Sequence, residues 1–158
     1  MQRSIIYLTA GLVALFLQTT IFSHLPIKPD LVLVLTVCLG LSAPPLSGVV
    51  LAFVLGCITD VFAGSTVGFF ALTRTVVFLL VYSTRGRLYF ESYLAKAGLV
   101  SIAALIEATM LVFLVGFTSG SPVLTSSMGR MMAGPVLLTA LFAPLCFMVL
   151  RRTRIVPL

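Results

Sequence analysis

The sequence predicts an all-α integral membrane protein, a compact bundle of six transmembrane helices with both termini in the cytoplasm. The chain of 158 residues is 60% hydrophobic and only 9% charged, whereas a soluble domain carries about 25% charged residues. The mean hydropathy is +1.22. Apolar segments follow one another along the whole chain, and the basic residues gather on one side of the resulting topology. We expect one transmembrane domain over residues 1–158.

The apolar segments cover roughly residues 4–22, 31–43, 46–63, 67–83, 96–117 and 129–150. A full span needs about 17–25 residues, so every segment except the second is long enough. That second segment is bounded by Asp30 and by Pro44-Pro45. It is a thin or partly extended span, or a re-entrant piece. The first segment follows Arg3, exceeds the length of a signal-peptide apolar region and has no A-x-A-like site after it. We interpret it as a retained span.

The distribution of basic residues decides the number of crossings. With six crossings and Arg3 inside, the outer side holds Lys28, with Arg130 just past an outer loop. Five crossings would place Arg3 opposite the other basic clusters, so six crossings agree better with the positive-inside rule. The cytoplasmic side then holds seven basic residues, namely Arg3, Arg85, Arg87, Lys96, Arg151, Arg152 and Arg154.

Four charged residues fall inside the expected spans: Asp60, Arg74, Glu107 and Arg130. A charge at the bilayer centre costs roughly 2.5–3.5 kcal/mol on insertion scales. The short turn after residue 63 brings Asp60 and Arg74 to a comparable depth on two antiparallel helices. We therefore expect these two to form an ion pair, within a network in which all four charges neutralise one another. A substrate or ion pathway, and a lipid head-group contact for Arg130, are the alternatives.

Small residues recur every four positions in the third segment. Such a row lets helix backbones approach closely in lipid, and it places the acid at its fourth position on a face turned toward protein. A smaller pair, Ala10 and Ala14, lies in the first segment and marks either internal packing or a partner interface. The row consists of Gly48, Ala52, Gly56, Asp60 and Gly64.

The expected cytoplasmic loop between the fourth and fifth segments mixes basic and aromatic residues. Aromatic side chains favour the membrane–water interface, so the loop is interpreted as an interfacial anchor, with a docking strip for a cytoplasmic partner as the alternative. Its candidate residues are Arg85, Arg87, Tyr89, Phe90 and Tyr93.

Several functional classes find no support in the sequence. The basic residues are too few and too scattered for nucleic-acid binding. The single histidine, His24, lies in a polar loop, and GSTVG at residues 64–68 departs from G-x-S-x-G. Cys38, Cys57 and Cys146 lie in apolar runs without C-x-x-C spacing. We therefore expect no enzymatic activity, no cofactor and no metal site.

Three stretches resemble the MreD family of rod shape-determining membrane proteins: QTTIF at the end of the first segment, KPDLVLVLTVCLGL, and GVVLAFVLGCITDVFAGSTVGFFALTRTVV. The resemblance implies a non-catalytic subunit of the elongasome, in the bacterial cell membrane, that regulates lateral peptidoglycan synthesis and cell shape. It implies MreC as the first partner, with MreB, RodA and a penicillin-binding synthase in the larger complex and membrane lipids around the bundle. The residues that carry it are Pro29, Asp30, Gly48, Gly56, Asp60 and Gly68.

The alternative function is the substrate-binding subunit of an energy-coupling-factor vitamin transporter, which is similar in size and helix number. Ala10 and Ala14 would suit the docking helix of that class. The short outer loops without tryptophan do not, because a ligand site needs several convergent polar groups.

Overall fold

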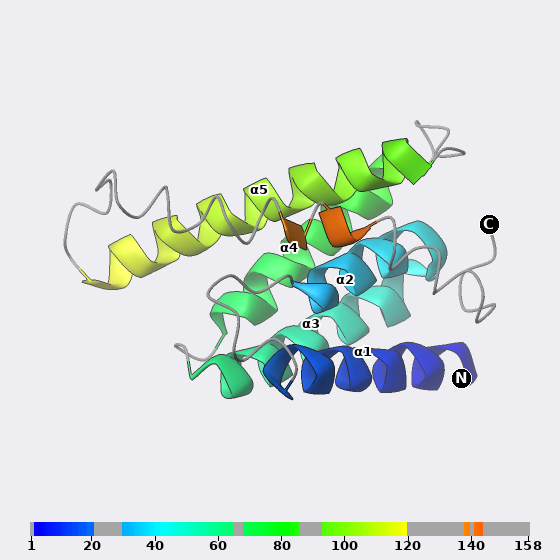
Figure 1. Cartoon of the computed structure of the whole chain (residues 1–158), viewed down its shortest axis with the longest axis horizontal. Coiled ribbons are helices and arrows are strands. Elements are labelled where there is room, and N and C mark those ends of the chain that lie inside the picture. The colour runs from blue at the N-terminus through cyan, green and yellow to red at the C-terminus, as the bar shows by residue number, and fades with distance from the viewer. Residues whose placement is uncertain are drawn as a thin grey trace.

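The structure, a computed structural model, describes residues 2–20, 30–64, 68–85, 93–119, 138–139 and 141–143. All elements in this part of the chain are helical, which confirms the all-α class for these residues (Figure 1). Each bounded helix lies on one of the first five expected segments, with ends within three residues of the expected ones. The helices are α1 Gln2–Thr20, α2 Leu31–Ser42, α3 Pro45–Ala63, α4 Phe69–Thr84 and α5 Tyr93–Ser119.

Helix α2 is enclosed by the rest of the bundle. It packs against α1, α3, α4 and α5, and every residue from Val32 to Gly40 is buried. This explains why its sequence is apolar on all sides, as expected for a helix without a solvent or lipid face. Its 12 residues measure about 18 Å, at 1.5 Å per residue. The helix ends before two extended residues, Ala43 and Pro44, which lead directly into α3.

Two apolar clusters meet at α2 and α4. One joins α2 and α4 to α5 through residues such as Val37, Val77 and Val100, and it includes Ala143 from the sixth segment. The other joins α1, α2 and α3 to Phe78 of α4. Consequently, α2 and α4 form the centre of the bundle, and α1 and α5 lie on opposite sides of it (Figure 1).

Only some helices reach the length of a full membrane crossing. Among the described residues, α3 and the stretch Ala97–Thr118 of α5 are long and apolar enough to span a bilayer, whereas α1, α2 and α4 supply shorter apolar stretches. The crossing of all six segments therefore stays a prediction. Of the expected segment 129–150, only residues 138–139 and 141–143 lie within the described part of the chain.

Candidate functional site

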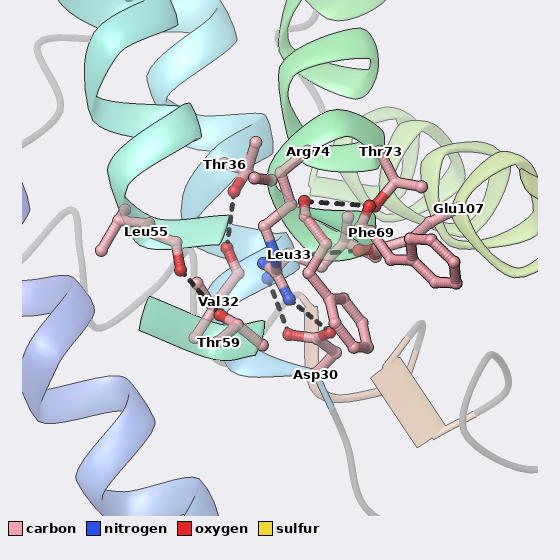
Figure 2. Close-up of polar contacts among 12 residues, drawn as sticks. Asp30, Val32, Leu33, Thr36, Leu55, Thr59, Phe69, Thr73, Arg74 and Glu107 are labelled. Atoms are coloured by element: carbon pink, nitrogen blue, oxygen red, sulfur yellow. Dashed lines mark hydrogen bonds and ion pairs between the residues drawn. The ribbon is translucent and has the colours of Figure 1, made fainter. Parts of the chain in front are cut away.

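Asp30 begins α2 and connects it to the sixth segment. Its Oδ1 accepts a hydrogen bond from the backbone N–H of Leu33 at 2.9 Å, which makes Asp30 the N-cap, a position where aspartate is strongly preferred. Its own backbone N–H donates to Oγ1 of Thr139 at 2.9 Å. The second carboxylate oxygen of Asp30 points into the bundle (Figure 2).

Arg74 of α4 is fully buried and lies between two carboxylates (Figure 2). Its Nη2 is 2.6 Å from Oδ2 of Asp30, and its Nε is 3.7 Å from Oε1 of Glu107 on α5. Its guanidinium carbon also lies 5.8 Å from the ring centre of Phe70, within the range of a cation–π contact. One guanidinium therefore joins α4 to the start of α2 and to the middle of α5. We call Asp30, Arg74 and Glu107 the charge cluster.

The two ion pairs of the charge cluster differ in quality. The Asp30 pair is a short charge-assisted hydrogen bond. The Glu107 pair is too long for a hydrogen bond. Arg74 Nε, Arg74 Nη1 and Glu107 Oε1 are buried and have no hydrogen-bond partner in the part of the chain that the structure describes.

Asp60 of α3 is also fully buried, and it binds the first turn of α4. Its carboxylate accepts hydrogen bonds from the backbone N–H groups of Gly68 at 2.9 Å, Phe70 at 2.9 Å and Ala71 at 3.2 Å. The first N–H groups of a helix have no partner within the helix, and the positive end of the helix dipole favours a carboxylate there. Asp60 thus caps α4 from the preceding helix.

The structure corrects the ion pair expected between Asp60 and Arg74. Asp60 directs its oxygens at the amides that begin α4, whereas Arg74 lies three to six residues further along the chain than these amides. The ion pairs of the guanidinium are with Asp30 and Glu107, while Asp60 attracts it only through a weaker electrostatic interaction. Arg130, the fourth expected member of the network, lies outside the described residues.

The small residues of α3 face α4. A Cβ atom added to Gly56 would overlap the backbone of Ala71, and one added to Gly48 would overlap the ring of Phe78. Gly64, at the end of the row, terminates α3 in a left-handed conformation with φ of 61°. The two helices therefore approach closely along an antiparallel hairpin, since low-numbered residues of α3 meet high-numbered residues of α4.

The small residues of α1 also face inward. Ala10 and Ala14 pack against the apolar cluster that contains Ala52 and Leu55 of α3. Gly11 lies directly against the side chain of Leu55. This face of α1 is used within the bundle.

The residues expected in the cytoplasmic loop are described only in part. Nη1 of Arg85 donates a hydrogen bond to the backbone oxygen of Ala43 at 3.2 Å, just past the end of α2. Tyr93 is described only as the first residue of α5. Arg87, Tyr89 and Phe90 lie outside the described residues.

The sequence analysis missed Asp30 as a member of the charge cluster and Thr139 as its neighbour. A signal for part of this was present, because an aspartate directly before an apolar run is typical of a helix N-cap. Its pairing with Arg74, 44 positions later, depends on tertiary structure. Among the described residues, no group of three or more potential metal ligands occurs. The contacts of the charge cluster join α4 to α2 and to α5.

Comparison with known protein families identifies a match. A sequence profile of the family described as rod shape-determining protein MreD matches residues 2–153. This range includes all three members of the charge cluster, the Asp60 cap and the small-residue row. Searches of curated proteins and of solved structures returned no significant match.

Proposed function

Because the chain belongs to the MreD family of rod shape-determining proteins, we propose that it is a non-catalytic subunit of the bacterial elongasome. In this role it binds the membrane helix of MreC and helps to position the wall synthase. The larger complex also contains MreB, RodA and a penicillin-binding synthase. MreD proteins are bacterial membrane proteins that determine cell shape, and they are not a known enzyme family. The match over residues 2–153 is the observation that carries the proposal.

The arrangement of charges supports a scaffold. The buried carboxylates and Arg74 serve contacts between helices: Arg74 joins α4 to the start of α2 and to α5, and Asp60 joins α3 to the start of α4. The outward faces of the helices carry large apolar side chains, among them Phe16 of α1 and Phe53 of α3. Such faces suit lipid or the membrane helix of a partner, since packing and shape drive helix association in lipid.

The directions of the helices support successive membrane crossings. Asp30 at the start of α2 meets Arg74 early in α4, so these two helices run parallel. Gly11 of α1 lies against Leu55 of α3, and Phe16 lines a groove together with Phe62. Residue numbers rise in the same direction along both helices, so α1 and α3 also run parallel. The hairpin of α3 and α4 is antiparallel. We propose six crossings with both termini in the cytoplasm, in the inner membrane.

The vitamin-transporter alternative gains nothing from the described residues. Ala10 and Ala14, its candidate docking pair, pack inside the bundle. A groove of about 170 Å³ between α4 and α5 is lined by apolar side chains and Thr84, and another between α1 and α3 is entirely apolar. Neither offers the convergent polar groups that a vitamin needs.

Crosslinking in living cells tests the proposal. A photo-crosslinking amino acid replaces Phe16 of α1 or Phe53 of α3, which are 69% and 51% exposed, and partners are identified by mass. Leu80 of α4, 45% exposed, serves as a matched control on another face. We expect MreC to be labelled from at least one of the first two positions. Labelling of a transporter's coupling ATPase, with none of MreC, would overturn the proposal.

A further inference from the structure

The groove between α4 and α5 follows the axes of both helices. Each helix contributes four lining residues, from Val77 to Thr84 and from Leu99 to Ile106. On both helices these residues are spaced i, i+3, i+4 and i+7, which marks one straight face of a helix. Seven residues of helix cover about 10 Å, and the volume of the groove is about 170 Å³. The groove is therefore long and narrow, and its shape suits one extended chain.

The floor of this groove is buried and its walls are exposed. Val81 and Ala103 are each 3% exposed and form the floor, whereas Leu80 of α4 and Ile102 of α5 are 45% and 57% exposed. The groove therefore opens toward the surroundings of the bundle, which in a membrane are hydrocarbon chains. Its one polar lining residue, Thr84, donates its hydroxyl to the backbone oxygen of Val81. The lining thus favours a hydrocarbon occupant.

One end of the groove adjoins an exposed positive charge. Thr84 is the last residue of α4, and Arg85 follows it as the C-cap. Arg85 is exposed and donates a hydrogen bond to a neutral group, the backbone oxygen of Ala43. In the part of the chain that the structure describes, both ion pairs belong to Arg74. The sequence from residue 85 to residue 96 also carries three basic residues and one acidic residue. An anionic group therefore complements this end of the groove.

We propose that the groove binds one acyl chain of an anionic phospholipid, whose phosphate lies beside Arg85. A zwitterionic lipid offers the same chains without a net charge, so the basic end of the groove selects the anionic lipid. The opposite end, between Val77 and Ile106, adjoins Arg74 and Glu107 of the charge cluster. The lipid therefore joins the same two helices as the weaker ion pair. This inference rests on the membrane location in the proposed function, and it requires no protein partner.

Fluorescence quenching by brominated lipids tests the site in vesicles. The chain contains no tryptophan, so a single introduced tryptophan reports the lipids that touch it. Ile102→Trp places this reporter in the wall of the groove. Leu105→Trp is the matched control, because Leu105 is 56% exposed on the same helix and does not line the groove. The vesicles contain phosphatidylglycerol and phosphatidylcholine, and the bromine is carried by the chains of one lipid at a time.

We expect bromine on phosphatidylglycerol to quench the groove reporter preferentially. One basic residue near anionic lipid corresponds to a preference of about fivefold, and we expect little preference at Leu105→Trp. Arg85→Gln, combined with Ile102→Trp, should abolish the preference, while Arg85→Lys should retain most of it. A thermal unfolding midpoint close to that of the unmodified protein shows that each variant is folded.

Equal quenching of the groove reporter by the two lipids would overturn the proposal, as would a preference that survives Arg85→Gln. Weak quenching by both lipids would also overturn it, because a second copy of the chain would then cover the groove. Leu80→Trp and Leu79→Trp repeat the comparison from α4, where the two leucines are 45% and 47% exposed and only Leu80 lines the groove. The vesicles hold this protein alone, so the result is separate from the labelling of MreC in cells.

Discussion

Two buried acids of this bundle, Asp60 on α3 and Glu107 on α5, are stabilised in different ways. Asp60 accepts three backbone hydrogen bonds from the helix that follows it in the sequence. Glu107 faces a guanidinium at 3.7 Å, and its Oε1 has no hydrogen-bond partner. A nearby helix end can satisfy a carboxylate almost completely, whereas a charge from a distant part of the sequence is matched less well. Asp60 secures one hairpin, and the charge cluster holds separate parts of the bundle together.

The largest expected effect comes from Arg74→Met. This change leaves Asp30 and Glu107 buried without their shared cation, and breaking a buried ion pair by removing one partner costs about 3–5 kcal/mol. We expect the protein level in cells to collapse and thermal unfolding in detergent to shift strongly downward. Arg74→Lys is the matched control, and we expect an intermediate loss because one ammonium cannot serve two carboxylates in the same way. Wild-type stability of Arg74→Met would contradict the importance of the cluster.

Asp60→Ala is expected to come next, at about 2–3 kcal/mol, because several amides at the start of α4 lose their acceptor. The same contacts predict that exchanging the charges, Asp60→Arg together with Arg74→Asp, gives no rescue relative to either single reversal. An arginine cannot accept hydrogen bonds from the amides. Protein levels of the single and double variants provide the measurement. If the double variant recovered to the normal protein level, that result would support a direct Asp60–Arg74 ion pair and contradict this prediction.

Gly56→Ala is expected to destabilise the hairpin of α3 and α4 by about 2 kcal/mol, as overpacking commonly does. The added methyl group would meet the backbone of Ala71, which cannot rotate away. Gly11→Ala is the control, because an added methyl group there would meet only the end of the Leu55 side chain, which can move aside. The midpoints of thermal unfolding of the two variants are compared, and a larger loss of stability in Gly11→Ala would contradict this assignment.

The smallest effect is expected for Glu107→Gln, below about 1 kcal/mol, because Glu107 makes no hydrogen bond to Arg74 and the amide keeps its shape. Asp30→Asn, the corresponding change at the other carboxylate, should cost about 2 kcal/mol, since it removes a charge-assisted hydrogen bond. Unfolding of the two variants side by side measures the asymmetry of the cluster. Equal losses would show that both ion pairs contribute equally.

The sequence was most informative where local patterns determine structure. Alternating apolar segments and turn residues predicted the helices, and the row from Gly48 to Asp60 lies on the face of α3 that packs on α4. The partner of Arg74 was not predictable in this way. Hairpin geometry favoured Asp60, the nearest acid along the chain. In the structure its carboxylate instead accepts hydrogen bonds from the amides at the start of α4. The actual partner, Asp30, precedes a short helix whose central position no periodic pattern reveals.

The short helix α2 has a consequence for how much the chain can vary. Arg74 holds the residue before α2 and Arg85 holds the backbone oxygen of the residue after it. These arginines are 11 residues apart on α4, about 16 Å along its axis, while α2 measures about 18 Å. The distance between Arg74 and Arg85 therefore matches the length of α2, and both contacts can form only if α2 keeps that length. One inserted residue would turn the end of α2 by about 100° and move it by 1.5 Å, so α2 should tolerate changes of side chain far better than changes of length.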